Sequence, residues 1–210
     1  FDVSTGENAK INYEREHLEG ALHIDLNSQL AEIKEDFSQG GRHPLPEIKQ
    51  FAKTLSILGI TINSHIVIYV DKIGSNAAAR CWWMLKSAGH SKVQVLNGGM
   101  DHAKKNKFPL SSTIEVAKSV TEIYPIKKWL LPTVELIEVE KMAQDSSCLI
   151  VDVRSKERFD GIFEPIDLIA GHIPNAMNIP FTENLDENGL FLKPHELKNI
   201  YKKKFGDKES

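Results

Sequence analysis

The sequence predicts an α/β protein made of two related domains, each a mainly parallel sheet flanked by helices on both faces, with the second domain incomplete. Short runs rich in Val and Ile at residues 1–3, 66–70 and 93–96 have the length and composition of buried strands. Helical patterns lie between them, as the crossover connections of parallel strands require. A further strand-like run at residues 148–153 begins the same order again.

The helices of the first domain follow from apolar spacing and glycine positions. Apolar residues recur every three or four positions across residues 48–58, which predicts a helix with one buried face, and Gly59 suits the left-handed position that ends it. A second helix is predicted to carry Ala78, Cys81, Trp82 and Leu85 on one face and to end near Gly89. A tight turn at residues 97–99 precedes a third helix that starts close to Asp101.

The second half of the chain repeats the first. Phe-Asp-Val-Ser at residues 1–4 leads to a turn at His17, and Val-Asp-Val-Arg at residues 151–154 leads to a similar turn at His172. A repeat period of about 150 residues indicates a duplicated domain.

Domain limits follow from this repeat. We expect a first domain over residues 1–111 and the N-terminal part of a second over residues 134–210. Residues 112–133 are expected to form a linker, because serines, prolines and lysines interrupt the apolar pattern there.

Composition narrows the function classes. With 41% hydrophobic residues and a net charge of -3, the 210-residue chain gives no reason to expect nucleic acid or a membrane as partner. Cys81 and Cys148 are too far apart for a metal cluster or a disulfide framework, so we expect a cytoplasmic protein without a metal. Both cysteines lie in apolar runs and are expected to be buried structural thiols.

Motifs in both halves resemble the tandem-domain rhodanese family of thiosulfate and 3-mercaptopyruvate sulfurtransferases. The motifs that carry the resemblance are Asp2 and residues 17–21, 40–46, 80–84, 89–90, 95–100, 152–154, 158–161, 170–174 and 178–181. The resemblance implies an enzyme in which a cysteine thiolate takes the outer sulfur of an anionic donor as a persulfide. It then passes the sulfur to cyanide or to a thiol, including a protein thiol such as that of thioredoxin. No metal or organic cofactor is implied.

The resemblance places the reactive cysteine in a loop between a strand and the N-terminus of a helix, where backbone N–H groups favour anions. In the first copy this loop contains Asp71, Gly74 and Ser75 but no cysteine, so we interpret it as vestigial. Asp71 either accepts hydrogen bonds from the loop amides or is a solvated loop aspartate. In the second copy the repeat predicts the loop near position 220, outside these 210 residues.

Arg158 is the predicted substrate contact, because it matches the family arginine that faces the catalytic loop and a guanidinium suits a sulfonate or carboxylate group. The alternative is a surface arginine paired with Glu157 or Asp160. Members of the resembled family that are specific for mercaptopyruvate usually have a second arginine shortly downstream. Residues 164–167 contain none, so the resemblance favours thiosulfate as the donor.

Asp152, Arg154 and His172 are expected to support this loop rather than to react. Two other functions stay open: a non-catalytic binding or regulatory module, and a related phosphatase chemistry with a longer loop. A cysteine near position 220 would support the transferase.

Overall fold

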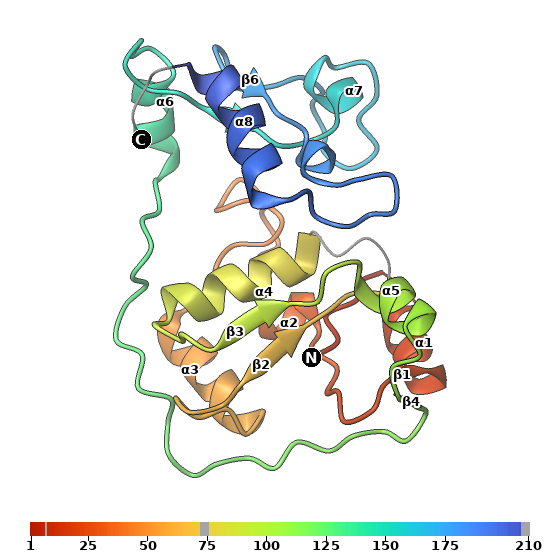
Figure 1. Ribbon diagram of the computed structural model, residues 1–210. Helices are drawn as coiled ribbons and strands as arrows, with labels where there is room; N and C mark the ends of the chain where they lie inside the picture. Colours follow the sequence, from red (N-terminus) through yellow and green to blue (C-terminus); the bar gives the residue numbers. More distant parts are fainter. Residues whose placement is uncertain (7, 72–75, 207–210) are drawn as a thin grey trace. The chain divides into compact units, whose positions relative to one another are not determined.

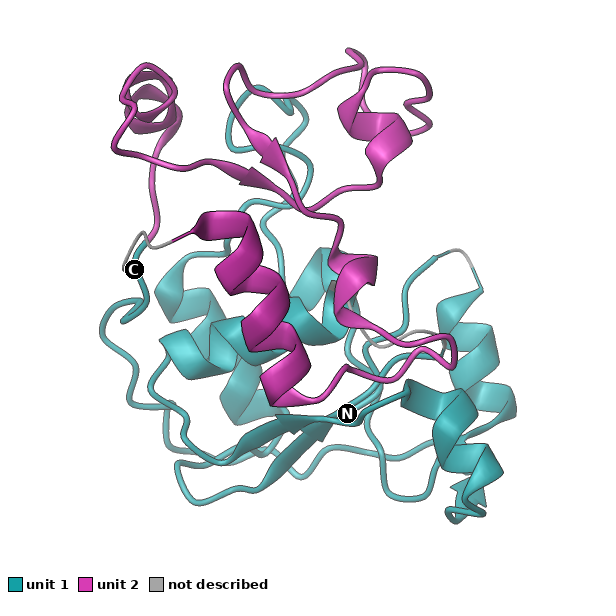
Figure 2. Cartoon of the chain, turned by 45° about the horizontal axis from the view of Figure 1, so that its top comes forward, with its two compact units in different colours: residues 1–132 teal, residues 133–210 magenta. Residues whose placement is uncertain are grey.

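A computed structural model describes residues 1–6, 8–71 and 76–206. The chain divides into two compact units, Phe1–Pro132 and Thr133–Ser210, which Figure 2 shows in different colours. Both units combine helices with short strands (Figure 1).

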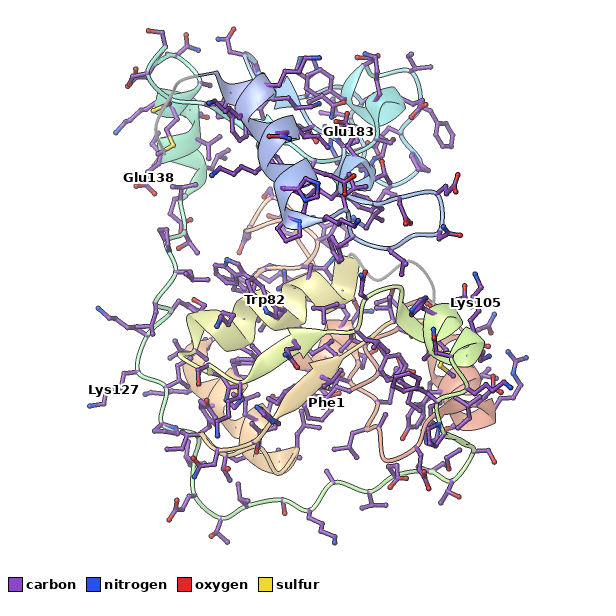
Figure 3. The ribbon with its side chains drawn as sticks, in the orientation of Figure 1. Phe1, Trp82, Lys105, Lys127, Glu138 and Glu183 are labelled. Carbon is purple, nitrogen blue, oxygen red and sulfur yellow. The ribbon has the colours of Figure 1, made fainter. Side chains whose placement is uncertain are left out.

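Unit 1 has a parallel sheet at its centre. Strand β2 (Ile66–Ile68) pairs in parallel with β3 (Val93–Val95), and Ile66 is opposite Val93. The predicted strand at residues 1–3 is reduced to bridges from Asp2, which pairs in parallel with His23 on one side and Tyr69 on the other. Phe1 accordingly lies beside β2 (Figure 3), where its amino group donates to the Val67 carbonyl.

Helices and one short antiparallel pair complete unit 1. The helices are α1 (Ala9–Arg15), α2 (Leu26–Gln29), α3 (Ile48–Ile57), α4 (Asn76–Ser87) and α5 (Gly99–Lys105). The antiparallel pair joins β1 (His17–Leu18) to β4 (Leu110–Ser111). Helix α5, which was predicted to start close to Asp101, begins two residues earlier, at Gly99.

The core of unit 1 lies between these layers. Phe51, Ala52 and Leu55 of α3 are buried, which confirms the predicted apolar face. They belong to one cluster with Ile68 of β2 and Met84 of α4. Helix α4 contacts β2 and β3 and runs along them in Figure 1. This packing places the N-terminus of α4 near the C-terminal ends of the two strands.

Gly59 ends α3 as predicted, with a φ of 74°. The Ile60 N–H donates to the Leu55 carbonyl at 2.9 Å and the Gly59 N–H donates to the Ser56 carbonyl at 3.1 Å, the two bonds of a Schellman motif. A Cβ at Gly59 would also collide with the Lys118 carbonyl oxygen. Glycine is therefore required here for two reasons, its conformation and the close approach of another backbone segment.

Residues 112–132 of the segment expected as a linker pack against the rest of unit 1. The Trp129 ring is 5.4 Å from Phe51 and 6.1 Å from Trp83, measured between ring centroids. The buried Tyr124 hydroxyl lies 2.8 Å from Nδ1 of His90. Residues 112–132 are therefore part of unit 1, and Tyr124 belongs to its core.

Unit 2 is smaller and repeats the beginning of unit 1. It contains α6 (Leu136–Met142), β5 (Val151–Asp152), α7 (Lys156–Phe159), β6 (Met177–Asn178), the 3-10 helix η1 (Phe181–Asn184) and α8 (Pro194–Phe205). Strand β5 is shorter than the predicted 148–153 and pairs in parallel with β6. Asp152 is opposite Asn178, as Asp2 is opposite His23 in unit 1.

Within the described ranges, no helix is both long enough and apolar enough to cross a bilayer.

Candidate anion-binding site

Both units form the same turn after the strand-end aspartate. The Asp152 Oδ1 accepts the Arg154 N–H at 2.9 Å, and the Asp2 Oδ1 accepts the Ser4 N–H at 2.8 Å. Such a turn is a common use of an aspartate carboxylate next to its own backbone. The repeat therefore keeps the local geometry but places a guanidinium in unit 2 where unit 1 has a hydroxyl.

Arg154 ties this turn to a neighbouring loop. Its Nη2 donates to Asp152 Oδ2 at 2.6 Å and to the Gly171 carbonyl at 2.7 Å. Hydrogen bonding by Arg154 is the main reason that the pKa of Asp152 is lowered, and the same contact raises the pKa of Arg154. Both groups are therefore held in their charged forms.

Arg158, on α7, is paired with two carboxylates. Its Nε donates to Glu164 Oε2 at 2.9 Å, and its Nη2 lies 2.9 Å from Glu164 Oε1 and 2.8 Å from Asp167 Oδ2. The alternative pairing with Glu157 or Asp160 is wrong, since Asp160 instead accepts from Lys156 Nζ at 2.7 Å. Asp160 pairs with Lys156, four residues before it, and Arg158 pairs with carboxylates of the loop that follows α7.

Glu164 is the centre of this cluster. Its side chain is 4% exposed, and its carboxylate contacts Arg158 and, at 3.3 Å, Nη1 of Arg154. The backbone N–H groups of Ile166 and Asp167 each donate to Oε1 at 3.0 Å. These donors, with Arg158 as the strongest, outweigh desolvation and lower the pKa of Glu164 to about 2.

Glu164 and Asp167 have no site role in the sequence-based prediction, which notes only that no arginine occurs at residues 164–167. The signal available in the sequence is a glutamate and an aspartate three positions apart, shortly after Arg158. Nothing in that spacing states that the loop folds back onto α7. The contact therefore comes from the tertiary structure.

His172 contacts the same helix from the other end of the loop. Its Nδ1 lies 2.7 Å from the Phe159 carbonyl oxygen, and its ring stacks on Phe159 with 3.7 Å between centroids. In unit 1 the His17 Nδ1 lies 2.6 Å from the Tyr13 carbonyl oxygen, and those two rings stack at 4.0 Å. The two histidines make the same pair of contacts in both copies.

Asp152, Arg154 and Asp167 line a surface hollow of about 440 Å³ together with residues 169–173. The hollow is open, and charged side chains form part of its wall. Three of the four predicted residues of unit 2, Asp152, Arg154 and His172, line this hollow. Arg158 does not line it, but its ion pair with Asp167 joins it to the wall.

The corresponding loop of unit 1 is described only in part. The Asp71 N–H donates to Ser4 Oγ at 2.7 Å, which ties the start of the loop to the strand-end turn. Gly74 and Ser75 lie outside the described residues. The hypothesis that the Asp71 carboxylate accepts the loop amides therefore stays a prediction.

The two cysteines have different surroundings. Cys81 is fully buried in α4, and burial raises its pKa to about 12, which confirms the expected structural thiol. Cys148 is half-buried and precedes β5 rather than starting it, so the expected burial in a strand is only partly realised.

Comparison with protein families decides the relationship of this chain. The family described as "Rhodanese-like domain" matches residues 1–106 and 135–208, most of each unit. The chain belongs to the rhodanese family. The α/β fold is thus that of two rhodanese-like domains, and the expected tandem family is confirmed.

Curated relatives within the rhodanese family are sulfurtransferases. The chain is 33% identical over 210 residues to 3-mercaptopyruvate sulfurtransferase of Mus musculus, and the match covers 95% of this chain and 66% of the relative. It is 32% identical over 200 residues to thiosulfate sulfurtransferase of Cricetulus griseus, covering 93% and 65%. The chain thus spans just under two thirds of the length of these relatives.

A solved rhodanese structure has the same fold. SseA from Escherichia coli, described as a 3-mercaptopyruvate sulfotransferase, matches with a TM-score of 0.80 and 26% identity, over 100% of this chain and 77% of that one.

Proposed function

We propose that this protein is a sulfurtransferase that moves the sulfane sulfur of thiosulfate or mercaptopyruvate to cyanide or a thiol. The observation that carries the proposal is the rhodanese match to both units together with relatives named as sulfurtransferases. The Arg158 guanidinium supports it, because an arginine fork suits an anionic donor.

The reaction needs a thiolate as nucleophile. It attacks the outer sulfur of thiosulfate, the sulfur–sulfur bond breaks, and sulfite leaves with the bonding electrons, so that the enzyme carries a persulfide. Cyanide then attacks the terminal sulfur, which releases thiocyanate and restores the thiolate. Buried Cys81 and half-buried Cys148 do not suit this step, and the repeat predicts the nucleophile near position 220 of a longer protein.

Within this proposal, Asp152, Arg154 and His172 support the site and Arg158 contacts the donor. The absence of a second arginine near Asp167 favours thiosulfate over mercaptopyruvate. The acceptor would be cyanide or a small thiol, or a protein thiol such as that of thioredoxin. Two free cysteines suit a reducing compartment, so we propose the cytoplasm.

The test is a thiosulfate-to-cyanide assay on the full-length protein. Formation of thiocyanate that is lost when the cysteine near position 220 is replaced by serine would support the transferase. Another residue at that position, with no thiocyanate formed, would instead favour a non-catalytic binding module. Unit 1 favours that alternative for itself, since its cysteine is buried.

A further inference from the structure

The Arg158 guanidinium has two edges with different occupants. Glu164 closes the inner edge, where Nε and Nη2 each lie 2.9 Å from one of its oxygens. On the outer edge, formed by Nη1 and Nη2, Asp167 Oδ2 lies 2.8 Å from Nη2. A guanidinium has five N–H donors. Within the part of the chain that the structure describes, these contacts engage the donors on Nε and Nη2, which leaves those on Nη1 for a further anionic oxygen.

The two carboxylates are held very differently. The Glu164 side chain is 4% exposed and also receives Arg154 and two backbone N–H groups. The Asp167 side chain is 42% exposed, and besides its ion pair with Arg158 it attracts the Arg154 guanidinium. Moving Glu164 would break several charge-assisted hydrogen bonds from a buried carboxylate, whereas moving Asp167 weakens a half-exposed ion pair, which is worth less.

The charges of the cluster also indicate that a carboxylate must move before an anion binds. Two guanidinium groups, of Arg154 and Arg158, face three carboxylates, of Asp152, Glu164 and Asp167. The formal sum of these five charges is -1. An anion that enters the hollow therefore meets no excess positive charge unless one carboxylate moves away from its arginine.

We propose that Asp167 is an internal competitor for the sulfur donor. Two oxygens of the anionic donor bind Nη1 and Nη2 of Arg158, and Asp167 leaves Nη2 as they do so. Glu164 stays on the inner edge as the positioning residue of Arg158. Asp167 lines the open hollow, so its carboxylate has solvent to move into. This inference rests on the proposed function, because it assumes that Arg158 contacts the donor.

The test compares Asp167→Asn with the unchanged full-length protein. Sulfate, which cannot donate a sulfane sulfur, is titrated by calorimetry at constant ionic strength. In Asp167→Asn, sulfate no longer has to displace a carboxylate from Arg158. Because an exposed ion pair contributes little free energy, we expect sulfate to bind this variant about two- to five-fold more tightly. The KM for thiosulfate is expected to fall by a similar factor, and Asp167→Glu is expected to restore the original affinity.

Asp160→Asn is the matched control. It removes the same charge from the same short segment, but Asp160 pairs with Lys156 and not with Arg158. Equal affinities of Asp167→Asn and the unchanged protein would overturn the inference, and so would an equal gain in Asp160→Asn, which indicates a general charge effect. Urea unfolding of each variant, with Asp167→Ser as a second replacement, checks that the fold is kept.

A third variant separates this inference from the proposed function. If Arg158→Ala loses sulfate binding while Asp167→Asn changes nothing, the competitor role fails and the donor contact of Arg158 stands. If Arg158→Ala binds sulfate as well as the unchanged protein, both the donor contact and the competitor role fail.

Discussion

The imidazole of His172 stacks on the ring of Phe159, 3.7 Å away, while its Nδ1 contacts the backbone carbonyl oxygen of that same residue at 2.7 Å. One side chain thus holds both the ring and the backbone at the end of α7. His17 and Tyr13 have the same relationship in unit 1. A contact kept in both copies, of which the first has no thiol in its loop, indicates a structural role.

Replacing His172 should therefore lower stability. We expect His172→Ala to reduce the free energy of unfolding by about 1–2 kcal/mol, because it removes one hydrogen bond and one aromatic contact. His172→Phe keeps the stacking and should recover part of the loss. Urea denaturation of the three proteins measures this, and identical midpoints would contradict the structural role.

Gly59 provides a test of backbone packing in unit 1. We expect Gly59→Ala to destabilise the protein by about 1–3 kcal/mol, because it adds a side chain at positive φ and a clash with the Lys118 carbonyl. Gly41 has a φ of 81°, but no atom of the described residues lies within 4 Å of the place that an alanine Cβ would take, so Gly41→Ala isolates the cost of conformation alone. Equal losses in the two variants would show that Lys118 contributes nothing.

Glu164 should make stability depend on pH. Its pKa is about 2 in the folded protein and 4.5 ordinarily, so its contribution is full above pH 4.5 and disappears as pH falls toward 2. Glu164→Gln should be less stable than the unchanged protein at pH 7, and the difference should shrink as pH falls from 4.5 toward 2. Unfolding by urea at several pH values tests this, and a difference that does not vary with pH would contradict it.

Cys81 should not react in the native protein. Burial and a pKa of about 12 leave almost no thiolate at neutral pH, so a thiol reagent should modify Cys81 only after unfolding. In full-length protein whose cysteine predicted near position 220 is replaced by serine, the added change Cys148→Ser reports Cys81, and Cys81→Ser reports the half-buried Cys148 in the same conditions. Rapid labelling of native Cys148→Ser would show that α4 opens readily.

The duplicated α/β pattern, the buried face of α3 and the glycine that ends this helix could all be predicted from the amino-acid sequence. These features depend on local periodicity and on backbone conformations that few residues adopt, and both can be read from neighbouring residues. The rhodanese resemblance likewise came from motifs that stay in order along the chain.

The carboxylates that face Arg158 could not be predicted from the sequence, because they depend on the path of a loop. Glu157 and Asp160 are nearer in sequence, yet the loop after α7 folds back and brings Glu164 and Asp167 to the guanidinium. The contacts of Tyr124 and Trp129 likewise make residues 112–132 part of unit 1, where the sequence predicted a linker. Such contacts join segments whose separation is set by loop paths, and residue spacing carries no information about where a loop returns.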